Sequence, residues 1–139
     1  MILFAGDCSS FTNARARACV ICVECRKPRV IYSNYKLTER YQSALAVALS
    51  DFDYSCGAAV MPGSSSLRDK ILVRSELRCA TPIESQYYKL DSAQRDMCSY
   101  CTSGNATKPL DFTKKFRQVL PICKICLDNG KKPICSLPY

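Results

Sequence analysis

The stretch CVICVECRKPR occupies residues 19–29 and places a cysteine at every third position, directly before a basic run that contains one proline. Two cysteines separated by two residues form a tight turn that aims both sulfurs at one metal ion. A tetrahedral site takes one such pair from this run, so one cysteine is left over. The pair is either Cys22 and Cys25 or Cys19 and Cys22, and we favour the first because the basic turn follows Cys25.

The remaining cysteines supply two more pairs with the same spacing. The chain has 139 residues and 11 cysteines, and 21 residues separate its last two pairs, close to the usual separation in four-cysteine zinc sites. Two isolated cysteines lie between the first pair and the second. The predicted zinc ligands are Cys22, Cys25, Cys56 and Cys79 at a first site, and Cys98, Cys101, Cys123 and Cys126 at a second. Cys8, Cys19 and Cys135 are expected to be spare.

Two other arrangements of these cysteines remain open. In a cross-brace, the first pair joins Cys98 and Cys101, and the two isolated cysteines join the last pair. In an iron–sulfur protein, the run that starts at Cys19 contributes three ligands, although Arg29 stands where the usual motif has its fourth cysteine. We prefer two sequential zinc sites because 22 residues separate Cys56 from Cys79, whereas the middle ligands of cross-brace domains lie close together.

Composition limits the compartment and the chemistry. The N-terminus has too short an apolar run for a signal peptide, and no stretch approaches the length of a membrane span. We therefore expect no membrane association and an intracellular, nuclear protein whose clustered cysteines bind metal. The chain has no histidine, which removes most nucleophilic and zinc-dependent hydrolytic mechanisms. We expect no enzymatic activity and no small-molecule substrate.

Hydrophobic periodicity predicts a helix over residues 37–52, with Thr38 as its N-cap, and a second helix over residues 111–120 that Pro121 ends. Alternation over residues 70–78 predicts a strand that leads to Cys79. The expected fold is a small α+β zinc-stabilised domain of the zinc-ribbon or treble-clef kind, with two short helices and short strands. It is expected to form one unit over residues 1–139, with a first zinc half at 19–80 and a second at 98–135.

The cysteines and their neighbours also resemble a known kind of module. The strings CRKPR, YSCG, LRCATPIESQYY, CSYC and LPICKIC are similar to a cysteine-rich module of uncharacterised animal proteins, some of which are carried by mobile (transposable) elements. The resemblance covers about residues 19–133 and includes the eight predicted ligands. It implies zinc and DNA binding, without a more specific activity.

Charge points to a polyanionic partner. The net charge is +8, with +4 over residues 1–40, −1 over 41–107 and +5 over 108–139, so both cysteine-rich ends are basic. Basic ends of this kind favour phosphate contacts, and we expect a nucleic acid, DNA more than RNA. The candidate nucleic-acid ligands are Arg26, Lys27, Arg29, Lys36, Lys114, Lys115, Arg117, Lys131 and Lys132. The alternative is a protein-interaction or architectural module within a larger complex.

Overall fold

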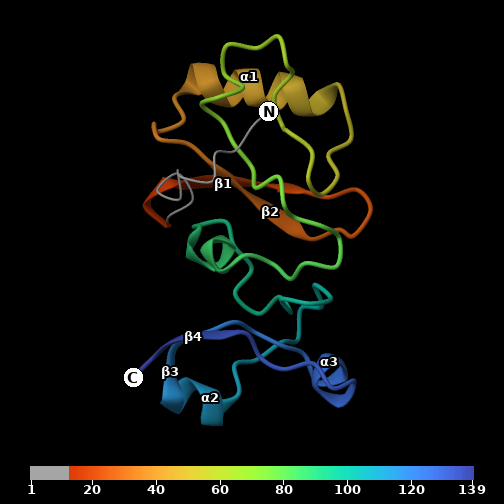
Figure 1. Ribbon diagram of the computed structural model, residues 1–139, viewed down its shortest axis with the longest axis vertical. Helices are drawn as coiled ribbons and strands as arrows, with labels where there is room; N and C mark the ends of the chain where they lie inside the picture. The colour runs from red at the N-terminus through yellow and green to blue at the C-terminus, as the bar shows by residue number, and fades with distance from the viewer. Residues whose placement is uncertain (1–12) are drawn as a thin grey trace. The chain divides into compact units, whose positions relative to one another are not determined.

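The computed structural model describes residues 13–139 and divides the chain into two compact units, Met1–Asp91 and Ser92–Tyr139 (Figure 1). The boundary falls between the two predicted zinc halves, so each half lies within its own unit. The secondary structure is α+β, as predicted, with short helices and two antiparallel two-stranded sheets. Across the described residues, no helix combines the length and the apolar character needed to cross a bilayer.

Unit 1 is built on a hairpin of β1 (Ala16–Ile21) and β2 (Pro28–Tyr32), preceded by the 3-10 turn η2 (Asn13–Arg15). Figure 1 shows helix α1 (Glu39–Ser50) on one side of this sheet and the 3-10 turn η3 (Ser85–Lys89) on the other. All five residues of β2 are buried because both of its faces are covered. The core between α1 and the sheet includes Ile31, Leu45 and Val73.

The predicted helix over residues 37–52 is confirmed as α1. The Thr38 Oγ1 accepts a hydrogen bond from the Tyr41 amide at 3.3 Å, which is the expected N-cap. Leu45 and Ala48 are its buried residues. The predicted amphipathic pattern thus packs its apolar stripe against the sheet.

The predicted strand over residues 70–78 was too long. Only Leu72 pairs with a strand, in a two-bond bridge to Tyr32. Ile71 and Val73 are buried on one side, as the alternation required, but the chain turns at residues 75–76 before a ladder can form. The segment is therefore extended only briefly beside β2.

Unit 2 contains helix α2 (Leu110–Lys115), strand β3 (Phe116–Val119), helix α3 (Lys124–Asp128) and strand β4 (Cys135–Pro138). The predicted helix over residues 111–120 was half right. It ends at Lys115 because Phe116 is already extended and begins β3, which pairs with β4. Pairing with a strand distant in sequence therefore outweighs the local helical pattern.

Candidate metal centres

Four cysteine sulfurs meet at one point in unit 1. The group consists of Cys22, Cys25, Cys56 and Cys79, whose sulfurs all lie within 4.8 Å of one another. The Sγ atoms of Cys22 and Cys79 are 3.8 Å apart, and those of Cys25 and Cys56 are 3.6 Å apart. We call this group site 1. It contains Cys25 and not Cys19, which settles the register of the opening run.

A second group of the same kind lies in unit 2. Its members are Cys98, Cys101, Cys123 and Cys126, again within 4.8 Å of one another. The Sγ atoms of Cys98 and Cys126 are 3.8 Å apart, and those of Cys101 and Cys123 are 3.5 Å apart. We call this group site 2. The two groups are those of the sequential arrangement, and the cross-brace is wrong because its two pairs lie in different units.

The distances fit one metal ion at each site. A metal–thiolate bond of about 2.3 Å, the length found for zinc, implies sulfur–sulfur distances of about 3.8 Å in a tetrahedron. The four sulfur pairs quoted above lie at 3.5–3.8 Å. No two of the described cysteines form a disulfide. Each group is therefore a candidate four-thiolate metal centre.

The two CxxC turns have the same backbone design. In unit 1 the Cys22 amide donates to the Lys27 carbonyl (3.1 Å), and the Arg26 amide returns a bond to the Cys22 carbonyl (2.9 Å). In unit 2 the Cys98 amide donates to Ser103 (2.8 Å), and the Thr102 amide bonds to the Cys98 carbonyl (3.0 Å). Arg26 and Thr102 both have positive φ angles, 64° and 68°. This repeated turn presents the two sulfurs of each pair on one side.

Tight turns deliver the two isolated cysteines of site 1. Cys56 and Gly57 are the central residues of a turn that the Ala58 amide closes onto the Ser55 carbonyl at 3.0 Å. Gly57 has a φ of +90°, and a Cβ there would lie 3.1 Å from the Leu77 carbonyl oxygen. Cys79 lies in a turn of its own, because the Thr81 amide donates to the Arg78 carbonyl at 2.9 Å.

Site 2 is assembled by a short bridge and by the start of α3. Thr107 and Ile122 exchange two backbone hydrogen bonds of 3.0–3.1 Å, which bring Cys123 beside the first turn. Ser99, which is fully buried, donates from both its amide and its hydroxyl to the Pro121 carbonyl, each at 3.0 Å. Cys123 is the N-cap of α3. A turn followed by a helix start resembles the treble-clef arrangement expected from the sequence.

Backbone amides favour a thiolate in each group. Desolvation raises the pKa of Cys22, but amide hydrogen bonds from Cys25, Glu24 and Cys56 outweigh it and lower the pKa to about 6. The amide of Cys126 is the main cause that lowers the pKa of Cys123 to about 6. Thiolates are the form that binds metal. Each site therefore contains one cysteine that is ready to bind at neutral pH.

Arg29 is a functional residue that the sequence assigned to the wrong partner. It was expected to reach a nucleic acid, but it is fully buried. Its Nε donates to Cys56 Sγ at 3.2 Å, and its terminal nitrogens donate to three carbonyls at 2.7–2.8 Å, those of Arg78, Thr81 and Pro82. The guanidinium therefore places a positive charge beside the Cys56 sulfur, which would offset the charge of a thiolate there, and it holds the Cys79 turn. A basic residue in an otherwise apolar strand was the available signal.

Lys27 was also expected on the surface and is buried, with its Nζ donating to the Cys79 carbonyl. The other candidate nucleic-acid ligands keep exposed side chains: Arg26, Lys36, Lys114, Lys115, Arg117, Lys131 and Lys132. Arg26 follows Cys25 at the end of the first turn. The exposed cations therefore belong mainly to unit 2.

The remaining cysteines do not join either group. Cys19 lies in β1 opposite Val30, and Cys135 lies at the start of β4, opposite Val119. Neither belongs to site 1 or site 2, as expected. Cys8 lies outside the described residues.

Comparison of the chain with protein-family models, with curated proteins and with solved structures finds no match. The class of protein is therefore defined by its own geometry, as a small α+β protein with two candidate four-cysteine metal centres. The resemblance to a module of animal and mobile-element proteins stays a prediction.

Proposed function

We propose that the protein is a non-catalytic zinc-binding module that acts in the nucleus of the cell. It binds nucleic acid, with a preference for DNA over RNA, through the basic surface of unit 2. The observation that carries the metal part is the pair of four-cysteine groups with tetrahedral sulfur spacing. Four thiolates fill the coordination sphere of zinc and leave no position for water or substrate. The sites are thus structural, and their role is to hold the fold.

A single ion per site is a better fit than an iron–sulfur cluster. In a four-iron cluster each cysteine binds a separate iron atom, so the ligand sulfurs lie farther apart than around one ion. The sulfurs of site 1 and site 2 approach to 3.5–3.8 Å. Cys19, which a cluster motif would use, is not in site 1.

Elemental analysis of protein purified under reducing conditions tests the metal assignment. We expect two zinc equivalents per chain and a colourless solution. A four-thiolate site can also hold a single iron ion. A brown or red protein that contains iron would therefore contradict the assignment of zinc.

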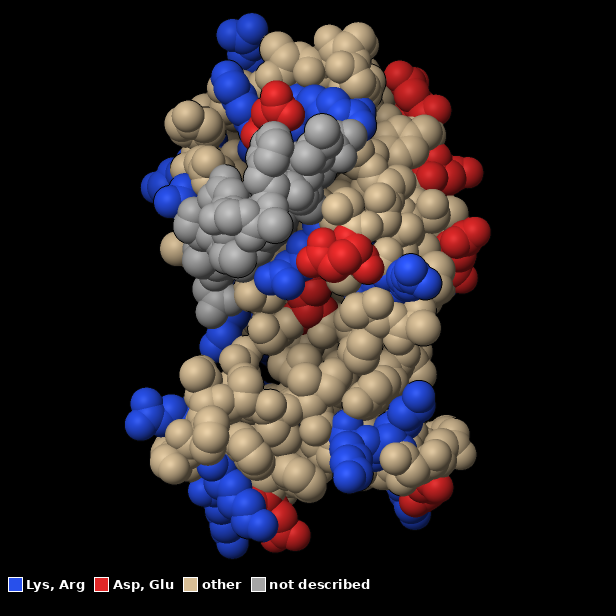
Figure 2. Space-filling view, viewed as in Figure 1, with Lys and Arg blue, Asp and Glu red and all other residues tan. Residues whose placement is uncertain are grey.

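The nucleic-acid part rests on the exposed charge of unit 2. Its exposed cations from residue 108 onward are Lys108, Lys114, Lys115, Arg117, Lys124, Lys131 and Lys132. Over residues 108–139 only two acidic residues, Asp111 and Asp128, oppose them. Figure 2 shows blue groups prevailing over red on the face of this unit that is in view. Such a surface favours phosphate neutralisation.

Aromatic rings accompany two of these cations. Arg117 lies 5.6 Å from the ring centroid of Tyr139, and Lys131 lies 5.5 Å from that of Tyr100. Tyr139 is 75% exposed, so its ring is free to stack on a base. Cations beside exposed aromatic rings are typical of surfaces that bind single-stranded nucleic acid.

Fluorescence anisotropy over a series of salt concentrations tests nucleic-acid binding, with single-stranded and duplex DNA and RNA oligonucleotides as probes. We expect affinity to fall steeply with salt. The double variant Lys114→Ala/Lys115→Ala should weaken binding of every sequence and reduce the log–log slope by about 0.9 for each phosphate contact that is lost. The matched control is Lys70→Ala/Lys89→Ala, two exposed lysines of unit 1. Equal effects of the two double variants would contradict an interface on unit 2.

A further inference from the structure

Strand β1 has an open edge. Within residues 13–139, the sheet of unit 1 contains only β1 and β2. The bond from the Cys22 amide to the Lys27 carbonyl fixes which backbone groups of β1 face β2. Bonded and non-bonded pairs alternate in an antiparallel ladder, so Cys19 and Ile21 direct their backbone groups away from β2. Among the described residues, no backbone group bonds to them on that side. Such an edge is a template for an added strand.

A groove of about 580 Å³ adjoins this edge. Ala16, Arg17 and Ala18 of β1 all line it. These three residues are consecutive, so the groove runs along the first half of β1. The opposite wall comes from α1 and includes Leu45 and Leu49. The groove therefore offers an apolar wall beside β1, where the outward backbone groups of Cys19 and Ile21 bond to no described backbone group.

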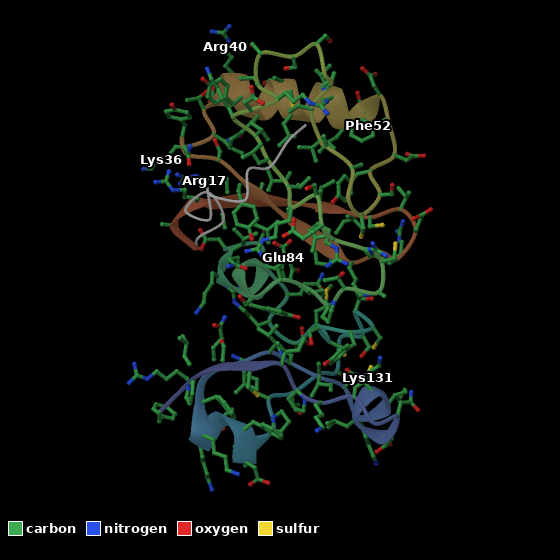
Figure 3. The ribbon with its side chains drawn as sticks, viewed as in Figure 1. Arg17, Lys36, Arg40, Phe52, Glu84 and Lys131 are labelled. Atoms are coloured by element: carbon green, nitrogen blue, oxygen red, sulfur yellow. The ribbon has the colours of Figure 1, made fainter. Side chains whose placement is uncertain are left out.

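The charge of this groove is positive. Arg17 and Lys36 line it, and none of its described lining residues is acidic. Neither cation has a carboxylate within salt-bridge distance among residues 13–139, where Arg74 and Glu84 form the ion pair of unit 1. Arg17 is anchored by donation from its Nε to the Ser33 carbonyl at 3.2 Å, and its terminal nitrogens take no part in that bond. Figure 3 shows Arg17 and Lys36 together at this end of the sheet, with Arg40 at the start of α1.

We propose that the edge of β1 binds an extended acidic segment of a partner protein as a third strand. Backbone hydrogen bonds to Cys19 and Ile21 supply the pairing, as in other cases of strand addition. Apolar side chains of the segment enter the groove beside Leu45, and its carboxylates pair with Arg17 and Lys36. The site lies in unit 1 and does not depend on the proposed nucleic-acid surface of unit 2.

A second copy of this chain is a poor occupant. The chain carries a net charge of +8, and pairing of two β1 strands would bring two copies of Arg17 to one ladder. The cations instead select a partner of opposite charge.

The test uses metal-loaded full-length protein and a panel of labelled ten-residue peptides. The apolar positions of the peptides are Val, Ile, Leu, Phe or Tyr, and these alternate with Asp or Glu. We expect at least one acidic peptide to bind and to slow amide hydrogen exchange of Cys19 and Ile21 at least tenfold. N-methylation of alternate peptide residues should abolish binding when it falls on the side that faces β1, and not when it falls on the other side.

The double variant Arg17→Glu/Lys36→Glu should weaken binding of this peptide at least tenfold. The matched control Lys70→Glu/Lys89→Glu should bind the peptide as the unmodified protein does. Unchanged metal content and circular dichroism would show that the variants are folded. The proposal is overturned if no peptide of the panel binds, or if lysine-containing peptides bind equally well. It is also overturned if N-methylation has no effect, or if a single-stranded oligonucleotide binds in the peptide's place and shows the same dependence on Arg17 and Lys36.

Discussion

At the residue scale, the protein places single polar side chains where they complete a metal centre or a buried strand. Glu84 is buried and accepts hydrogen bonds from the Val30 amide (3.0 Å) and the Tyr32 hydroxyl (2.7 Å). It also forms an ion pair with Arg74 at 3.1 Å. Burial, followed by the charge of Glu84 and its hydrogen bond, raises the pKa of Tyr32 well above its ordinary value. The outer edge of β2 is thus closed by the Glu84 side chain and by the Leu72 backbone, whereas no described backbone group bonds to the outer edge of β1 at Cys19 and Ile21.

Replacing Arg29 should damage unit 1 severely. Arg29→Ala removes a buried charge from Cys56 and leaves the carbonyls of Arg78, Thr81 and Pro82 without their donors. Loss of one partner from a buried charged network costs about 3–5 kcal/mol. We therefore expect the free energy of unfolding in urea to fall by about this amount, and site 1 to lose metal to a chelator sooner than site 2.

The exposed neighbour Arg26 provides the control for this measurement. Arg26→Ala removes a cation from the same turn without uncovering a buried group, so metal retention should stay near that of the unmodified protein. An equal loss of stability in both variants would mean that charge near the turn matters and the buried hydrogen bonds do not.

At the element scale, backbone turns position the cysteines of the two sites, a role that longer helices and strands have in larger proteins. The two CxxC turns, the Ser55–Ala58 turn and the Cys79 turn together present the sulfurs of both sites. Helices α2 and α3 are each only six residues or fewer, too short to be stable alone. The cysteines of site 2 at Cys123 and Cys126 tie α3 to the rest of unit 2, whereas α2 runs directly into strand β3.

The turn at Gly57 should not tolerate a side chain. Gly57→Ala would strain a residue with a φ of +90° and bring a Cβ to 3.1 Å from the Leu77 carbonyl oxygen. A strained backbone of this kind costs about 1–3 kcal/mol, and the shift would also displace Cys56. We expect a lower unfolding midpoint in urea and weaker metal retention at site 1.

Gly104 is the matched control, because a Cβ there would meet no atom within 4 Å. Gly104→Ala should leave the unfolding midpoint and the metal content unchanged. If both alanine variants behaved alike, the conformation of Gly57 would not be a determinant of site 1.

At the scale of the whole molecule, the two units differ in how much apolar core they possess. Unit 1 buries α1 against the hairpin. The metal-proximal cluster of unit 2 consists of Cys98, Ala106, Ile122, Cys123 and Cys126, so three of its five buried residues are proposed ligands. Val119 and Leu120 are also buried in this unit, but a unit of this size with so small a core needs another source of stability. We infer that the metal supplies it.

Removal of one ligand from site 2 should therefore unfold unit 2 alone. A structural zinc contributes about 10–16 kcal/mol to the folding of a small domain. Cys101→Ser and Cys126→Ser should each reduce the metal content from two equivalents to one. NMR spectra should show loss of dispersion for residues 92–139 and native resonances for unit 1.

Cys135→Ser is the control, since Cys135 lies outside both groups. This variant should keep two metal equivalents per chain. Two equivalents in Cys101→Ser or Cys126→Ser would refute site 2, and one equivalent in Cys135→Ser would revise its ligand set.

The sequence by itself identified cysteines that can bind metal, because the spacing of a CxxC pair is a local property that needs no knowledge of the fold. It also predicted α1, whose cap and apolar stripe are local. Only the tertiary structure decided the register at Cys25, the burial of Arg29 and Lys27, and the change from helix to strand at Phe116. Each of these depends on partners distant in the chain: Cys56 and Cys79 for Arg29 and Lys27, and β4 for Phe116. Spacing within the chain carries no information about such contacts.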